Sequence, residues 1–135
     1  MFDVKLKAEP ARAYESVSKE VASADVDAFV RETVARLRER YEPDGVPFGI
    51  YKGCDKEDAQ LVEICLPTRD GRNLLPAGEV AYTVARGEQC DYPAILSAYD
   101  AVVRFVEDSG RALAGPPRET YLGEAEMEIA FPVMP

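Results

Sequence analysis

Histidine is absent from the 135-residue sequence, and the three cysteines, Cys54, Cys65 and Cys90, form no CxxC pair. The chain therefore cannot build a Ser-His-Asp or Cys-His relay, and it has too few soft ligands for a conventional zinc site. It also lacks a glycine-rich phosphate loop, a Walker signature and a GxSxG elbow. We expect neither a metal nor an organic cofactor. Each cysteine is expected to be a small structural residue, and the alternative is that Cys90 lies near a ligand.

Long apolar runs are missing as well. No segment approaches the length of a membrane span. Residues 1–5 show neither the basic stretch nor the apolar segment that opens a signal peptide. We therefore expect a cytoplasmic protein that has no membrane partner.

Positive charge is scarce, since 16 Lys and Arg face 25 Asp and Glu and the net charge is −9. Such a charge repels phosphate backbones and argues against direct nucleic-acid binding. It permits cationic ligands, or an acidic surface that competes with DNA for a basic partner. The hydrophobic share of 47% and the charged share of 30% are typical of a soluble globular protein. At this length we expect a single domain, residues 1–135.

One order of predicted elements occurs twice along the chain. In the first copy, alternation and helical spacing predict two strands, an amphipathic helix and a hairpin, at residues 2–7, 13–21, 26–41, and 47–52 with 60–67. The polar residues 68–73 are predicted to form a loop. From Pro76 the pattern begins again, with a strand, an amphipathic helix and a hairpin at residues 78–86, 91–110, and 117–132. Asp91 is expected to cap this helix, Pro93 to lie in its first turn and Gly110 to end it.

The two hairpins match residue by residue. Gly45, Pro47, Tyr51 and Gly53 recur 70 positions later, and residues 62–64 with Pro67 correspond to residues 127–129 with Pro132, 65 positions later. Each unit alone, residues 4–67 or 76–133, would expose a sheet face and a helix face, so we expect the two to pack about an approximate two-fold axis. The predicted fold class is α+β: duplicated β-α-β-β units form an antiparallel sheet around a central cleft, with the two helices packed outside.

Residues 116–123 place Glu119 and Tyr121 two positions apart, on one face of a predicted strand. An inward-facing carboxylate needs hydrogen bonds, a cation or protonation to offset its lost hydration. Tyr121, and Tyr51 at the equivalent position of the first copy, can donate hydrogen bonds, and their rings attract cations. Gly49 is at the position of the first copy that corresponds to Glu119. One side of the predicted cleft would therefore have a carboxylate, and the other would have no side chain. The alternatives are an outward-facing Glu119 and tyrosines that only pack in the core.

A carboxylate beside a tyrosine could also catalyse hydrolysis. Glu119 would position or activate water as a general base, and Tyr121 would donate to the leaving oxygen. Such a site, without histidine, would accelerate the cleavage of a stable bond only weakly. It would therefore suit a strained or electrophilic substrate.

The chain resembles the GyrI-like small-molecule-binding domain over residues 4–133. The segments that carry the resemblance are PFGIY at 47–51, VEICLP at 62–67, PAGEVA at 76–81, Tyr92 with residues 98–99, RETY at 118–121 and MEIAFP at 127–132. The chain departs from the usual pattern at residues 87–92, which are longer than the common Gly-x-Tyr step into the helix.

The resemblance implies a duplicated fold with a central cleft. The roles it implies are effector binding for AraC-type and MerR-type regulators, drug sequestration, gyrase inhibition, and hydrolysis of cyclopropane-bearing natural products. In drug-sensing members a buried glutamate among aromatic residues recognises cations. By position that role would fall to Glu119, and the aromatic walls would be Tyr121, Tyr51, Tyr92, Tyr82 and Phe48.

We therefore expect a protein that binds a hydrophobic or cationic small molecule for sensing, sequestration or detoxification. The first alternative is a hydrolase that opens cyclopropane-type electrophiles, and the second is a gyrase-inhibitor-like protein interaction. The sequence contains no helix-turn-helix and no basic winged segment, so we expect no direct DNA binding by this chain. The macromolecular partner would be a second copy of the chain or a separate regulator.

Overall fold

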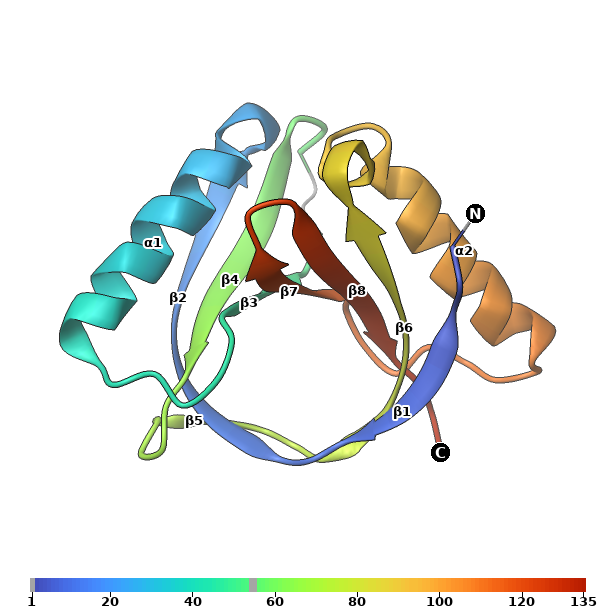
Figure 1. Cartoon of the computed structure of the whole chain (residues 1–135), viewed down its shortest axis with the longest axis horizontal. Helices are drawn as coiled ribbons and strands as arrows, with labels where there is room; N and C mark the ends of the chain where they lie inside the picture. Colours follow the sequence, from blue (N-terminus) through green and yellow to red (C-terminus); the bar gives the residue numbers. More distant parts are fainter. Residues whose placement is uncertain (1, 54–55) are drawn as a thin grey trace. The chain divides into compact units, whose positions relative to one another are not determined.

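The computed structural model of the chain describes residues 2–53 and 56–135, so Cys54, in a predicted turn, lies outside the described residues (Figure 1). The chain divides into two compact units. The first unit is Ala11–Pro76, and the second unit is Met1–Pro10 together with Ala77–Pro135. Each unit combines antiparallel strands with one α-helix, which confirms the predicted α+β class. None of the described helices has the length and apolar character needed to cross a membrane.

The first unit holds a sheet in the order β3-β4-β2-β5, with every pairing antiparallel. Its elements are β2 (Arg12–Ala22), the short 3-10 turn η1 (Ser23–Asp25), α1 (Val26–Arg40), β3 (Phe48–Tyr51), β4 (Ala59–Pro67) and β5 (Asn73–Leu75). Alternation along β4 sends Val62, Ile64 and Leu66 to one face, where they form a buried cluster with Leu37 of α1. The opposite face carries a second buried cluster, made of Tyr14, Phe48, Ile50, Cys65 and Leu75.

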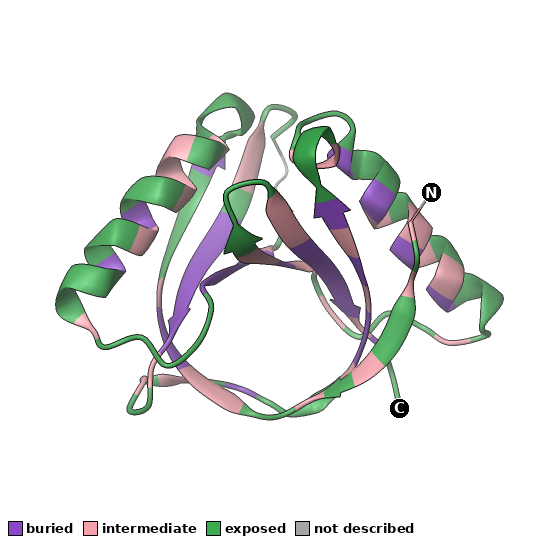
Figure 2. Ribbon diagram, in the orientation of Figure 1, coloured by how far each residue is buried: buried purple, intermediate pink, exposed green. Residues whose placement is uncertain are grey.

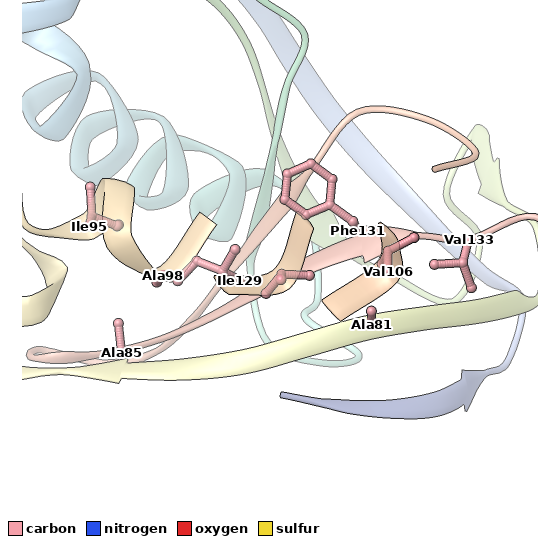
Figure 3. Close-up of a cluster of buried hydrophobic side chains, with 9 residues drawn as sticks. Ala81, Ala85, Ile95, Ala98, Val106, Ile129, Phe131 and Val133 are labelled. Carbon is pink, nitrogen blue, oxygen red and sulfur yellow. The ribbon is translucent and has the colours of Figure 1, made fainter. Parts of the chain in front are cut away.

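The second unit holds a sheet in the order β1-β6-β8-β7, again antiparallel. Its elements are β1 (Lys5–Glu9), β6 (Gly78–Arg86), the 3-10 turn η2 (Gly87–Cys90), α2 (Ile95–Asp108), β7 (Arg118–Gly123) and β8 (Glu126–Pro132). The helix lies along β6 and β8 (Figure 1). Its buried positions follow the side that faces these strands (Figure 2). Figure 3 shows the resulting core, which includes Ile95, Ala98 and Val106 of α2, Ala81 and Ala85 of β6, and Ile129 and Phe131 of β8.

The two sheets follow one pattern of strand register. Gly49 lies opposite Ile64 in the first unit, as Glu119 lies opposite Ile129 in the second. Tyr51 and Tyr121 likewise occupy matching positions, opposite Val62 and Met127. The edge strands match as well, because β5 pairs with β2 as β1 pairs with β6. The edge strand of each sheet therefore lies in the segment that leads along the chain into the other unit. β1 of the second unit leads into the first unit, and β5 of the first unit leads into the second.

Three local features differ from the sequence-based predictions. The predicted loop 68–73 gives way at Asn73 to the short strand β5. Helix α2 begins at Ile95 rather than next to Asp91, because residues 91–94 form a separate turn closed by the Ile95 amide donating to the Asp91 carbonyl at 2.8 Å. The N-cap of α2 is Ala94 rather than Asp91, and it makes no side-chain hydrogen bond.

The loop between β4 and β5 is fixed against β2. The Arg72 backbone amide and Nε donate to the Glu15 carboxylate at 2.8 and 3.0 Å. These contacts, the backbone hydrogen bond foremost, hold the pKa of Glu15 below its usual range. A Cβ on Gly71 would lie only 2.4 Å from the Tyr14 nitrogen, so this position has no room for a side chain. Glycine at 71 therefore allows the loop to approach the backbone of β2.

Candidate functional site

Glu119 lies on the helix-covered face of the second unit's sheet. It sits opposite Ile129 of β8, and directly opposed residues of neighbouring strands share a face. Ile129 belongs to the core beneath α2. Only 7% of the Glu119 surface is exposed. The outward-facing alternative for this residue therefore does not hold.

Tyr99 of α2 reaches this carboxylate, and its Oη donates a hydrogen bond to Glu119 Oε2. The Tyr99 ring packs edge-on against Phe131, with 5.9 Å between the ring centroids and an interplanar angle of 89°. Burial, then the negative charge of Glu119 and the hydrogen bond to it, raise the pKa of the Tyr99 phenol. Tyr99 is therefore a neutral donor at physiological pH, and it leaves the charge of an ionised Glu119 in place.

The sequence predicts an amphipathic helix that contains Tyr99 but assigns this residue no role in the site. The available signal was the hydroxyl itself, because a tyrosine within a buried stripe needs a hydrogen-bond partner for its oxygen. That partner could not be named from helical spacing, since Glu119 lies 20 residues away on another element.

Cys90 is close enough to Glu119 to be affected by its charge. Burial, followed by the charges of Asp91, Glu119 and Glu126, raises the pKa of the Cys90 thiol. Its Sγ donates to the Ala85 carbonyl at 3.4 Å. A protonated thiol is a poor nucleophile and a poor metal ligand. Cys90 therefore suits the packing role expected of a small structural residue.

The other predicted site residues fall into two groups. Tyr121 is half-buried and lies on the same face of β7 as Glu119. In the first unit, Gly49 is buried and Tyr51 packs against the cluster of β4 and α1. A cleft that contains these two residues together with Glu119 stays a prediction.

Three predicted wall residues lie elsewhere. Tyr82 and Arg118 both lie opposite Ala130, so Tyr82 is on the face of its sheet away from Glu119. Phe48 is fully buried on the face opposite Gly49, where its ring packs edge-on against Tyr14. Tyr92 precedes α2 and is 81% exposed.

The second unit thus brings together a buried carboxylate, a neutral phenol that donates to it, and a tyrosine on the same strand face. Such a group can attract an organic cation, or it can orient water beside a proton donor. Residues 2–53 and 56–135 contain no group of three or more Cys, Asp or Glu placed to hold a metal ion.

No known protein-family profile and no curated protein sequence matches the chain. Solved structures do resemble it. The C-terminal domain of EcmrR matches with a TM-score of 0.80 at 21% identity over 99% of this chain and 98% of that one. In an EcmrR–DNA complex the match has a TM-score of 0.79 at 23% identity over 98% of this chain. There the chain spans only 57% of the EcmrR chain.

Two other solved structures are similar at lower identity. A hydrolase from Listeria innocua matches with a TM-score of 0.72 at 13% identity, over 97% of this chain and 91% of that one. SAV2435 bound to tetraphenylphosphonium matches with a TM-score of 0.63 at 11% identity, over 98% and 94%. These likenesses show that the chain shares its fold with part of the DNA-bound protein EcmrR, with a hydrolase and with a protein bound to tetraphenylphosphonium.

Proposed function

We propose that the chain is a GyrI-like ligand-binding domain that takes a hydrophobic organic cation at Glu119. The observation that carries the proposal is the buried Glu119 carboxylate held by the Tyr99 hydroxyl. A neutral phenol stabilises a carboxylate through one hydrogen bond but does not cancel its charge. A cation whose charge is spread over an apolar body loses little hydration on entering such a site, and the carboxylate attracts it.

Two further observations support a cationic ligand. The chain carries a net charge of −9, which favours the approach of cations over that of anions. The aromatic rings of Tyr99 and Tyr121 add faces that attract positive charge. The likeness to SAV2435 bound to tetraphenylphosphonium supports the choice of that ion as the first probe. We propose sensing, sequestration or detoxification of such compounds as the biological use.

The test is a thermal-shift titration with tetraphenylphosphonium, using the neutral compound triphenylphosphine oxide as the matched control. A ligand at about 100 times its Kd raises the free energy of unfolding by about 2.7 kcal/mol. We expect a saturable rise in melting temperature with the cation and a much smaller one with the neutral compound. Equal shifts with both compounds, or no shift with either, would contradict the proposal.

Hydrolysis is the second candidate function, and the Tyr99–Glu119 hydrogen bond favours it. Glu119 can take a proton from water as the water oxygen bonds to an electrophilic ring carbon. The ring bond to that carbon breaks, and a tyrosine hydroxyl can protonate the group that leaves. The structural likeness to the Listeria innocua hydrolase extends to the fold.

Mass spectrometry of the protein incubated with a reactive cyclopropane compound tests this candidate. Turnover would add the mass of one water molecule to the compound, and we expect Glu119→Gln to slow it by about 100-fold or more if the carboxylate is the base. The control is Glu124→Gln, an exposed position of the turn before β8. Turnover that is the same in all three proteins would remove Glu119 from the reaction, and no turnover would leave binding alone.

The gyrase-inhibitor-like interaction, the absence of direct DNA binding and the choice between a second copy and a separate regulator as partner stay predictions. EcmrR occurs in a complex with DNA, and the chain matches only part of it. For the regulator alternative, this match supports one arrangement, in which a domain of this fold is part of a longer chain that is bound to DNA.

A further inference from the structure

The face of the second unit's sheet opposite Glu119 holds a second carboxylate and aromatic ring, and a lysine of the chain lies over both. Lys7 Nζ lies 4.3 Å from the centroid of the Tyr82 ring. The same nitrogen lies 2.9 Å from Glu128 Oε2 and donates a hydrogen bond to it. The three residues come from three neighbouring strands, β1, β6 and β8.

The strand register explains how one side chain reaches both groups. Lys7 pairs with Val80, which shares a face with Tyr82 two positions along β6. Glu128 pairs with Val84, on the same face again. The Lys7 side chain therefore extends from the edge strand across Tyr82 to the next strand but one. Its ammonium nitrogen lies over the ring and also meets the carboxylate.

The burial of Glu128 shows why a cation is needed there. Only 11% of its side chain is exposed, whereas 35% of the Lys7 side chain is exposed. A carboxylate withdrawn from water to this degree requires a positive partner or strong donors. Lys7 supplies both.

The first unit offers a natural comparison. Glu63 occupies the position that matches Glu128, and it is also buried and paired with a lysine, Lys52, at 3.0 Å. The position that matches Tyr82 holds Ser16, which donates to Glu63 at 2.7 Å. The first unit thus adds a hydroxyl donor to its ion pair, whereas the second places an aromatic ring beside the cation.

We propose that Tyr82 and Glu128 form a second organic-cation site, specific for a primary alkylammonium group, which Lys7 fills as a tethered ligand. In the intact chain the lysine keeps the site closed, because a tethered group acts at an effective concentration on the order of millimolar or above. Removal of the ammonium group opens the site to a free alkylammonium ion. The proposal does not depend on Glu119, which lies on the other face of the sheet.

Chemical rescue of Lys7→Ala tests this site. Alanine keeps Cβ, so n-propylammonium replaces the atoms that are lost. We expect Lys7→Ala to have a lower melting temperature than the original chain, and millimolar n-propylammonium to restore most of that difference in a saturable way. The neutral n-propanol and equal concentrations of sodium chloride should restore little of it.

Further variants show where the rescuing ion binds. Lys5→Ala removes an exposed lysine of the same strand, 63% of whose side chain is accessible, and it should show no rescue. Adding Tyr82→Leu or Glu128→Gln to Lys7→Ala should abolish the rescue. Adding Glu119→Gln should leave it unchanged, which separates this site from the proposed function.

A rescue no larger than that of sodium chloride, or one that survives Glu128→Gln, would overturn the proposal and leave Lys7 with a structural ion pair. If Lys7→Ala does not fold, Lys7→Met keeps a long apolar side chain at this position and removes the charge. The Tyr82 ring resonances in NMR spectra of that variant should then shift on titration with methylammonium, and unchanged resonances would equally overturn the proposal.

Discussion

Glu119→Gln is expected to weaken the binding of tetraphenylphosphonium by about 30-fold, or roughly 2 kcal/mol, and to change the binding of triphenylphosphine oxide by less than about 3-fold. Glutamine keeps the size of the side chain, and its amide oxygen can still accept the hydrogen bond from Tyr99. The substitution therefore removes the charge with little change in shape. A cation bound beside it would lose the attraction of that charge.

Isothermal titration calorimetry of both ligands against both proteins gives the two ratios directly. Glu124→Gln is the matched control, since it makes the same change of charge at an exposed turn and should alter neither Kd by more than about 2-fold. An equal loss of affinity for the cation and the neutral compound would show that Glu119 contributes shape or stability rather than charge.

The order of strands and helices could be predicted because each copy of the repeat carries a clear periodicity. The strand predicted over residues 78–86 is observed as Gly78–Arg86, and the helix predicted over 26–41 as Val26–Arg40. Alternation of apolar and polar residues predicts an extended strand, and a longer stretch with apolar residues at helical spacing predicts a helix. The strand β5 was missed because three residues are too few to show any period.

The pairing of the edge strands could not be predicted from periodicity. Residues 5–9 alternate as a strand should, yet alternation does not specify which other strand is the partner. In the structure β1 pairs with β6, which follows it by about half the chain, and β5 pairs with β2. Long-range pairing of this kind depends on the packing of the whole sheet.

The relative placement of two candidate site residues could be predicted from the sequence where both lie on one strand. Contacts between different elements could not be predicted. Glu119 and Tyr121 were placed on one face by their spacing, and the register agrees. Phe48 next to Gly49, and Tyr82 on β6, were named from the family resemblance. Adjacent strand residues point to opposite faces, so Phe48 could not share a face with Gly49. The Tyr99 contact joins α2 to β7 and required the structure.

Gly71→Ala is expected to lower the free energy of unfolding by about 3 kcal/mol. The added Cβ would lie 2.4 Å from the Tyr14 nitrogen and 2.5 Å from its carbonyl carbon. These are backbone atoms of β2, which pairs with both β4 and β5 and so cannot shift alone. The loop must move instead, and this strains or breaks the two hydrogen bonds from Arg72 to Glu15.

Urea denaturation of Gly71→Ala and of Gly78→Ala provides the measurement and its control. A Cβ at Gly78 would meet no heavy atom within 4 Å, so alanine there should change stability by less than about 1 kcal/mol. The expected difference in stability between the two variants therefore comes from the steric contact between residue 71 and β2. Similar midpoints for the two variants would mean that the loop can leave β2 at little cost. In that case the Arg72–Glu15 contacts contribute little to stability, because they depend on the same close approach.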